Sequence, residues 1–419
     1  MNGKSRRKRP RSGRFVKTGM VSPPGCMQYS GAMDVITRTK DLAAFCERLS
    51  GEPALTIDTE FLRERTYWPK LCLVQMASRQ EARAIDPLAD GIDLAPLFSL
   101  MRETGVVKVF HAARQDLEIF YHLMGAVPRP IFDTQLAAMV AGYGDSVGYE
   151  TLVNRIAKAQ VDKASQYTDW SRRPLSQRQI AYALADVTHL WPVYDRLSHT
   201  LAKTARSSWL DEEMAILTDP ATYKPDAEAA WRRLKPRNRN GRYLAILKGV
   251  AAWREDEAQA RDVPRNRVVR DEVVQQLASE QPTTLERLRE VRGLPRELKA
   301  GPDGSALVEI VRQALALPDK ALPTLRPPRR LPPEAGPVVD LLKVLLKMVS
   351  ERDRVAQKLI ATVADLEQIA ADGETADVPA LKGWRRQVFG NEALALKQGR
   401  LALAVSDGAL RALPIENAG

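Results

Sequence analysis

Residues 54–61 read ALTIDTEF, an apolar and β-prone run that leads directly into two acids. Gly51 and Pro53 precede the run and set its start. Because residues two apart on a strand face the same side, Asp58 and Glu60 point together. A carboxylate is costly to bury unless it is paired or bound to a metal. The stretch therefore predicts either a strand end whose acids meet solvent or part of a metal site.

A second apolar run, at residues 106–110, predicts another strand. The chain then passes through His111 into a helix expected at about residues 113–123, with Asp116 near its first turn. An acid at that position favours the helix dipole even when it faces solvent. By itself, Asp116 is therefore compatible with a surface acid as well as with a buried ligand.

A third segment has helical spacing and follows Ser176, whose side chain suits an N-cap. Tyr182 and Asp186 lie four residues apart in this segment, so they share one helical face. A core tyrosine above a surface acid would give the same pattern. Only the combination with the two earlier segments distinguishes a site from this simpler reading.

These five residues, in this order, resemble the pattern of the DEDD exonuclease superfamily in its tyrosine-bearing branch, and within that branch the ribonuclease D family. Four further stretches carry the resemblance: TYWPKLCLVQ at 66–75, FDTQ at 132–135, GYGDSVGY at 142–149 and TDWSRRPLS at 168–176. The resemblance covers residues 33–320 best. It implies an α/β ribonuclease H-like exonuclease domain, a mixed sheet flanked by helices, followed by one or two all-α HRDC-like helical bundles.

The resemblance also implies the roles of the acids. A residue matching Asp58 bridges two divalent cations, Mg²⁺ or Mn²⁺, and those matching Glu60 and Asp186 hold the cation that activates water. Asp58 holds the other, with an outer-sphere contribution from the position of Asp116. Tyr182 would orient the attacking water, because a phenol with a pKa near 10 is a poor base at neutral pH. Such a pair of cations suits phosphodiester hydrolysis, and oxygen ligands favour Mg²⁺ or Mn²⁺ over zinc.

Candidate substrate contacts lie beside the acids and in a basic stretch at residues 232–242. They are Thr59, Phe61, His111, Arg232, Arg233 and Lys235. His111 could equally be a core histidine with its hydrogen bonds satisfied. The basic stretch, with six cations and no acid, could be a solvated linker as readily as a contact for phosphates.

Composition narrows the class of protein. With 419 residues and 44% hydrophobic content, the chain can form two or three domains, and it has no apolar run long enough to cross a membrane. Three scattered cysteines, Cys26, Cys46 and Cys72, suggest a reducing compartment and neither disulfides nor a zinc site. No phosphate-binding loop for ATP occurs. We therefore expect a cytoplasmic protein, and a monomer, without zinc, ATP or membrane as partners.

The formal charge of +11 is unevenly distributed. Residues 1–33 contribute +8, residues 34–215 −3, residues 216–335 +6 and the remainder zero. The segment with the predicted catalytic acids is therefore the one region that is not basic or neutral. Divalent cations bound among acids would make such a region attractive to phosphate.

Changes in composition divide the chain. We expect strands at residues 54–58, 71–77, 82–86 and 106–110, with the first three antiparallel and the later ones parallel. Thr283 and Glu286 suggest a capping box in the middle helical region. The predicted parts are a basic tail or misassigned start at 1–33, an exonuclease domain at 34–215, a basic linker at 216–242, an HRDC domain at 243–317, a proline-rich linker at 318–337 and a second HRDC-like helical domain at 338–419.

The predicted activity is a metal-dependent 3′-to-5′ exoribonuclease that releases nucleoside 5′-monophosphates. The resemblance implies RNA as partner, with tRNA precursors as substrates and maturation of tRNA 3′ ends as the role. One alternative is a 3′-to-5′ DNA exonuclease, because no residue in the sequence can be assigned to reading the 2′-hydroxyl. A second is a catalytically inactive scaffold that binds nucleic acid, although no predicted carboxylate is lost.

Overall fold

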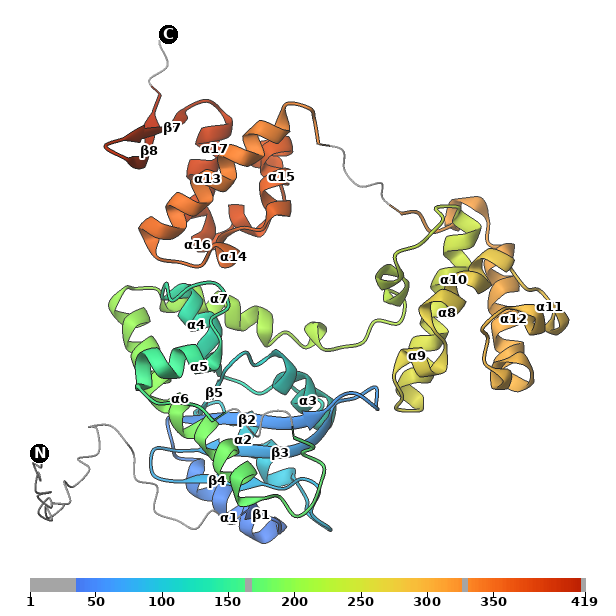
Figure 1. Cartoon of the computed structure of the whole chain (residues 1–419), viewed down its shortest axis with the longest axis horizontal. Helices are drawn as coiled ribbons and strands as arrows, with labels where there is room; N and C mark the ends of the chain where they lie inside the picture. The colour runs from blue at the N-terminus through green and yellow to red at the C-terminus, as the bar shows by residue number, and fades with distance from the viewer. Residues whose placement is uncertain (1–34, 163–167, 326–330, 416–419) are drawn as a thin grey trace, which may run out of the picture.

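The computed structural model describes residues 35–162, 168–325 and 331–415 (Figure 1). The predicted basic tail, residues 1–33, lies outside these ranges. Among the described residues, no helix combines the length and the apolar character that a membrane crossing requires.

A six-stranded mixed sheet forms the centre of the first domain, in the order β1-β4-β3-β2-β5-β6. Its strands are β1 Val35–Ile36, β2 Ala54–Leu62, β3 Lys70–Ala77, β4 Ala82–Ile85, β5 Val107–Phe110 and β6 Ile131–Asp133. β2 pairs antiparallel with β3, and β3 with β4, whereas β5 and β6 run parallel to β2. The predicted mixed sheet is thus confirmed. β1 and β6 were not predicted, because strands of two and three residues are too short to show an alternating pattern.

Helices surround this sheet, and α6 packs across β2, β3 and β4 (Figure 1). They are α1 Thr39–Leu49, α2 Ala95–Arg102, α3 Arg114–Met124, α4 Thr134–Val140, α5 Tyr149–Leu152, the π-helix η1 Val153–Ala157, α6 Gln177–Lys203 and α7 Ser207–Leu217. Ser176 caps α6 as predicted, since its hydroxyl accepts from the Gln179 amide in a complete capping box. This cap fixes where α6 begins, and so which of its residues face the sheet.

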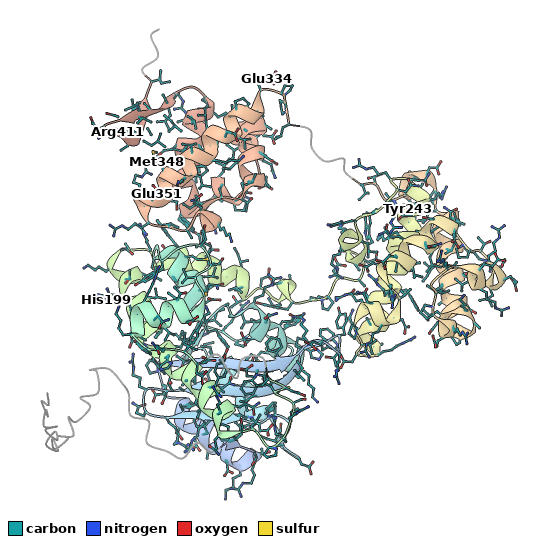
Figure 2. The ribbon with its side chains drawn as sticks, in the orientation of Figure 1. His199, Tyr243, Glu334, Met348, Glu351 and Arg411 are labelled. Carbon is teal, nitrogen blue, oxygen red and sulfur yellow. The ribbon has the colours of Figure 1, made fainter. Side chains whose placement is uncertain are left out.

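The middle part of the chain is a helical bundle with a hydrophobic core of its own. It consists of α8 Gly241–Ala260, α9 Arg265–Val268, α10 Asp271–Glu280, α11 Leu285–Glu290 and α12 Gly301–Ala316. Tyr243, labelled in Figure 2, is buried in this bundle and its hydroxyl donates to Gln275 Oε1 at 3.2 Å. The cap of α11 is Thr284, which accepts from the Arg287 amide, so the predicted cap at Thr283 was wrong by one residue.

Part of the stretch predicted as a basic linker belongs to this bundle. Residues Ala230–Leu234 form the 3-10 helix η4. Ala230, Trp231 and Leu234 are buried in the core of the bundle, while the arginines between them stay exposed. The many cations of this stretch conceal an apolar face only three residues wide, which is why the sequence suggested a linker.

The C-terminal part is helical and ends in a two-stranded sheet. Its elements are α13 Ala335–Asp353, α14 Gln357–Ile360, α15 Val363–Asp372, α16 Gly383–Arg385, α17 Asn391–Lys397, β7 Leu401–Ser406 and β8 Ala409–Pro414. The prediction of a helical domain at 338–419 did not include this hairpin. Its turn is formed by Asp407 and Gly408, both at positive φ. Asp-Gly is a strong hairpin signal in a sequence, so the turn of this hairpin was predictable from residues 407–408.

The C-terminal part and the first domain share one continuous hydrophobic core. Across their boundary, the Ala356 amide donates to the Met139 carbonyl at 3.0 Å. The rings of Trp209 and Trp384 stack with their centroids 4.7 Å apart and an interplanar angle of 8°. These contacts fix the C-terminal helices on α4 and α7, away from the middle bundle (Figure 1).

Candidate active site

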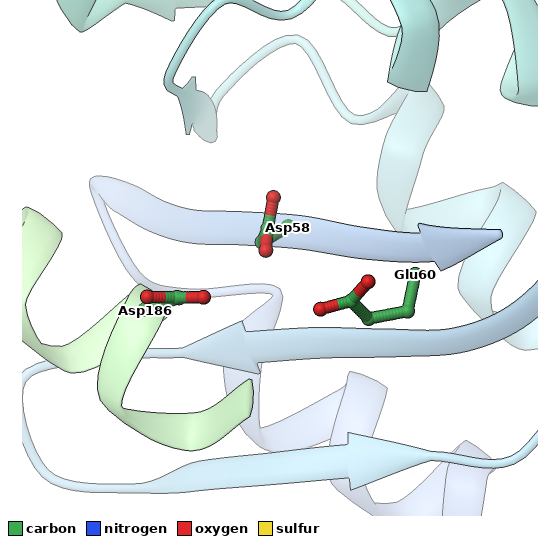
Figure 3. A group of neighbouring side chains, drawn as sticks. All are labelled: Asp58, Glu60 and Asp186. Carbon is green, nitrogen blue, oxygen red and sulfur yellow. The ribbon is translucent and has the colours of Figure 1, made fainter. Parts of the chain in front are cut away.

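Three carboxylates converge where β2 meets α6 (Figure 3). Asp58 and Glu60 come from β2, and Asp186 comes from α6. One oxygen of each lies within 4.8 Å of the others. The predicted common face of Asp58 and Glu60 on a strand accounts for two of them. The third depends on the packing of α6, which buries Ile180, Ala183 and Val187 and thereby presents Asp186 to the strand.

Asp116 stands beside this group without joining it. It lies in the first turn of α3 and is buried. The Thr59 hydroxyl donates to Asp116 Oδ1 at 2.5 Å. Asp116 is still near enough to Asp58 for their charges to interact. Its hydrogen bond from Thr59 holds the carboxylate in one orientation.

A residue without a predicted role, Asp133, fixes the start of α3. It accepts from the amides of Ala112 at 3.2 Å and Ala113 at 2.8 Å, just before α3 begins. It also caps α4 by accepting from the amides of Gln135 and Leu136. One buried carboxylate therefore sets the ends of both helices, and with them the position of Asp116. The FDTQ stretch at 132–135 was the signal in the sequence, although the spacing alone assigns it no function.

The electrostatics of the four acids favour bound cations. Burial raises the pKa of Asp58 to about 6 and that of Asp186 to about 8. Burial, together with the charges of Asp58, Asp186 and Asp116, raises the pKa of Glu60 to about 10. The pKa of Asp116 is also raised, first by burial and then by Asp58. Four acids that oppose one another's ionisation need positive charge nearby.

That positive charge does not come from side chains of the described residues. None of the described lysines or arginines forms an ion pair with any of the four acids. Asp186 Oδ1 is buried and has no hydrogen-bond partner among the residues that the structure describes. A buried carboxylate oxygen without a partner is costly. The donor set, carboxylate oxygens alone, therefore fits hard divalent cations.

Two tyrosines border the acids. Burial, followed by the charges of Asp186 and Glu60, raises the pKa of Tyr182, so its hydroxyl is protonated at neutral pH and can donate. Tyr149 ends the stretch GYGDSVGY, and no role was predicted for it. Its hydroxyl donates to the Asp186 carbonyl at 2.6 Å, which ties α5 to the turn of α6 that carries the acid. Sequence reasoning therefore missed Tyr149 as a positioning residue.

The predicted substrate contacts fall into two places. His111 is half-buried, its Nδ1 lies 3.0 Å from Thr134 Oγ1, and burial lowers its pKa. Phe61 follows the acids on β2 and packs partly against the core. The Thr59 hydroxyl already donates its hydrogen bond to Asp116. Arg232, Arg233 and Lys235 belong to η4 and the residue after it, on the side of the middle bundle, and do not join the acidic group.

Comparisons with known proteins agree with this geometry. The sequence model of the 3′-5′ exonuclease family matches residues 33–202, and that of the HRDC domain matches residues 244–311. Ribonuclease D of Nitrobacter hamburgensis is 54% identical over 376 residues, covering 90% of this chain and 98% of that protein. Ribonuclease D of Granulibacter bethesdensis is 50% identical and covers 88% and 94%, respectively.

A solved structure is similar over nearly the same length. It is the crystal structure of Escherichia coli RNase D, described as an exoribonuclease involved in structured RNA processing. The TM-score is 0.74 and the sequence identity 31%, covering 89% of this chain and 99% of that one. The similarity thus extends through the exonuclease domain into the helical parts.

Proposed function

The chain belongs to the ribonuclease D family and is a 3′-5′ exoribonuclease, and we propose that its reaction is hydrolysis at Asp58, Glu60, Asp116 and Asp186 with two divalent cations. Dependence on divalent metal follows from the fold and its acidic cluster. The choice of Mg²⁺ or Mn²⁺, the number of ions and the role of each residue are parts of the proposal.

One observation carries the assignment of residues. Asp58, Glu60 and Asp186 place oxygens within 4.8 Å of one another, and one of these carboxylates has a buried oxygen without a partner among the described residues. In the proposed arrangement Asp58 would hold both cations. Glu60 and Asp186 would complete the ligands of one cation, and Asp116 would assist in holding the other. Bound cations would supply a water of lowered pKa and stabilise charge on the attacking and leaving oxygens.

The remaining side chains orient and position the reacting groups. Tyr182 stays protonated and can direct an attacking water toward the scissile phosphate, rather than remove a proton from it. Tyr149 holds the backbone at Asp186, and Thr59 holds the carboxylate of Asp116. Since the Thr59 hydroxyl is already used, we assign substrate contact to Phe61 and His111 instead.

We propose RNA precursors with extra 3′ nucleotides, tRNA precursors above all, as substrates. Support comes from the E. coli relative, an exoribonuclease involved in structured RNA processing. The competing DNA exonuclease would use the same acids, so only substrate comparison separates the two. The inactive scaffold is disfavoured, because all four acids are present: Asp58, Glu60 and Asp186 lie together, and Asp116 lies beside them with a hydrogen bond from Thr59.

The test is a digestion of a tRNA precursor with a 3′ trailer, alongside a DNA strand of the same sequence. We expect shortening from the 3′ end, nucleoside 5′-monophosphates as products, dependence on Mg²⁺ or Mn²⁺, and complete loss of activity in EDTA. Product length and end chemistry are read by gel electrophoresis and chromatography. Equal cleavage of DNA would contradict the assignment of RNA as substrate. Cleavage in EDTA would contradict the proposed dependence on divalent cations.

Replacing Tyr182 with Phe should lower kcat by about 10- to 100-fold, the usual effect of losing a group that orients a metal-site ligand. The affinity for RNA should change much less, because the hydroxyl faces Asp186 and not a substrate group outside the acidic cluster. Single-turnover and binding measurements separate the two quantities. An unchanged kcat would remove Tyr182 from the reaction.

We also propose that the protein is monomeric and cytoplasmic. Cys46 and Cys72 are both free and buried, as is usual in a reducing compartment. Size-exclusion chromatography with light scattering tests the oligomeric state directly.

A further inference from the structure

A cavity of about 990 Å³ lies between the exonuclease domain and the middle bundle. Its walls come from the loop between β2 and β3, the outer face of α3, the segment at residues 222–234, and helices α8 to α10 of the bundle. It is distinct from the acidic site, because none of the four acids lines it. Four segments of the chain therefore meet at this cavity, two from the exonuclease domain and two from the part of the chain that follows it.

The cavity is basic, although the exonuclease domain as a whole is slightly acidic. Seven of its lining residues are lysine or arginine and four are aspartate or glutamate, an excess of three positive charges. A concave surface with one sign of charge concentrates ligands of the opposite sign. The identity of the ligand depends on which of these cations are free to bind it.

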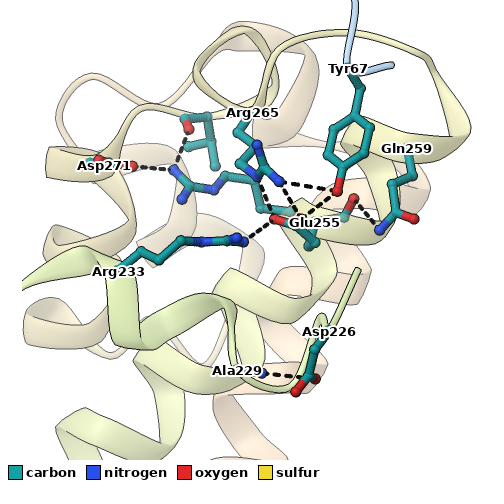
Figure 4. Close-up of polar contacts among 10 residues, drawn as sticks. Tyr67, Asp226, Ala229, Arg233, Glu255, Gln259, Arg265 and Asp271 are labelled. Atoms are coloured by element: carbon teal, nitrogen blue, oxygen red, sulfur yellow. Dashed lines mark hydrogen bonds and ion pairs between the residues drawn. The ribbon is translucent and has the colours of Figure 1, made fainter. Parts of the chain in front are cut away.

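Two of the arginines are already held by a buried acid (Figure 4). The side chain of Glu255 on α8 is only 1% exposed, and it accepts from Arg233 at 2.9 Å and from Arg265 at 2.6 Å. The Tyr67 hydroxyl, from the exonuclease domain, donates to the same carboxylate at 2.5 Å. Burial opposes ionisation of Glu255, but the bonds from Arg265 and Tyr67 outweigh it and lower the pKa to about 2. Arg233 and Arg265 therefore belong to the contact between the domains and are not free to bind a ligand.

Two further arginines are paired in the same way. Arg63 forms two hydrogen bonds with the Glu118 carboxylate, at 2.7 and 2.8 Å. Arg254, nearly buried, contacts Asp271 at 2.6 Å. Because their charges are neutralised in these pairs, Arg63 and Arg254 form part of the cavity wall and contribute little to binding an anion.

Three cations remain. Arg114, Lys224 and Arg232 are exposed, line the cavity, and form no side-chain hydrogen bond or ion pair within the described ranges. They come from three different parts of the wall: the start of α3, the segment leaving α7, and η4. Because they come from separate segments, these cations can each contact a different negative charge of an extended polyanion.

We infer that this cavity binds the phosphate backbone of an RNA strand upstream of the 3′ end that is being hydrolysed, through Arg114, Lys224 and Arg232. Arg114 precedes Asp116 by two residues, so the cavity and the acidic site lie on different sides of the same helix turn. An α-helix with its side chains is about 10–12 Å wide, a span that a few nucleotides cover. A strand passing α3 can thus reach both places.

An aromatic wall accompanies the cations. Trp68 lines the cavity and stacks on His122, with ring centroids 4.0 Å apart and an interplanar angle of 10°. Positive charge combined with aromatic rings is typical of grooves for single-stranded nucleic acid. The inference rests on the proposed function for its substrate, and it adds that affinity depends on nucleotides well away from the scissile bond.

The test combines binding and cleavage of RNA by the variant Arg114→Ala, Lys224→Ala, Arg232→Ala and by its three single variants. Each single change should weaken binding of a single-stranded RNA of about 20 nucleotides by roughly two- to fivefold, the range for one exposed charge contact. The triple variant should weaken it by about 10- to 100-fold. The slope of log affinity against log salt should fall by about 0.7 for each residue removed.

Cleavage distinguishes the cavity from the acidic site. The ratio of kcat/KM for the long RNA to that for a dinucleotide should fall by about 10- to 100-fold in the triple variant, since only the long strand reaches the cavity. Damage to the acidic site or to the fold would lower both values and leave their ratio unchanged. A wild-type protein that cleaved no RNA would refute the proposed function, while the binding measurements would still decide about the cavity.

A matched control removes the same charge elsewhere. Lys40, Lys203 and Arg292 are exposed and lie outside the cavity. Their triple replacement by Ala should leave the ratio and the salt slope near the wild-type values. The double variant Arg114→Lys, Arg232→Lys, with Lys224 intact, should retain most of the wild-type affinity. Equal losses in the two triple variants, or an unchanged salt slope in the cavity variant, would overturn the inference.

Discussion

Replacing Asp58 with Asn is expected to lower kcat/KM for RNA hydrolysis by about 10³-fold or more, the scale of removing a principal electrostatic group from an active site. Asp58 lies on the central strand β2, within 4.8 Å of both Glu60 and Asp186. Asn preserves its shape but brings an amide hydrogen where an anion is needed. RNA binding should persist, because the cavity cations are untouched.

The control for Asp58→Asn must exclude a folding defect. Burial raises the pKa of Asp58, and Asp58 in turn raises that of Glu60, so the ionised cluster opposes folding when no cation is bound. The variant should therefore unfold in EDTA at a temperature no lower than the wild type. Asp90, an exposed acid of the same domain, provides a matched Asp→Asn change with activity retained. Full activity of Asp58→Asn with Mn²⁺ would contradict the assignment.

Local periodicity predicted much of this site. The spacing of two on a strand placed Asp58 and Glu60 together, and the spacing of four on a helix placed Tyr182 with Asp186. Neither spacing shows that β2 and α6 come into contact, because that depends on packing across the sheet. The resemblance to a family supplied this step in the sequence reading, and the structure supplies it through the buried face of α6.

Long-range pairing was beyond the sequence. Arg232 and Arg233 are adjacent in the sequence and share the same sequence surroundings. Arg233 is held by Glu255, whereas Arg232 has no such partner among the described residues. A count of charge treats them alike. Asp133 shows the same limit, since its four amide donors come from two chain segments that only the fold brings together. Which polar groups are free is a property of tertiary structure.

The C-terminal helices are held on the exonuclease domain by a buried ion pair between Arg385 and Glu213. Arg385 Nε also donates to the Leu359 carbonyl at 2.6 Å, and its guanidinium lies 4.7 Å from the centre of the Trp384 ring. Burial raises the pKa of Glu213 in spite of the charge of Arg385. The pair therefore only partly offsets the cost of removing the carboxylate from water.

Replacing Arg385 with Met should destabilise the protein by about 3–5 kcal/mol, because Glu213 is left as an unpaired buried charge. The loss should be smaller at low pH. Without Arg385 the pKa of folded Glu213 rises further above its unfolded value, so the folded state binds the proton more tightly and the penalty shrinks as pH falls through the raised pKa. Denaturant unfolding at several pH values measures this change.

The double variant Arg385→Met, Glu213→Leu distinguishes the effect of the unpaired Glu213 charge from the loss of the other contacts that Arg385 makes. If the unpaired charge causes the loss, removing that charge as well should recover most of the stability, since apolar side chains of similar size often replace a buried ion pair without cost. If the double variant is as unstable as Arg385→Met, the bond to the Leu359 carbonyl and the contact with Trp384 are what hold the domains together. A loss below about 1 kcal/mol for Arg385→Met, the level of an exposed pair, would show that the boundary opens to water and that the shared core alone fixes the C-terminal helices.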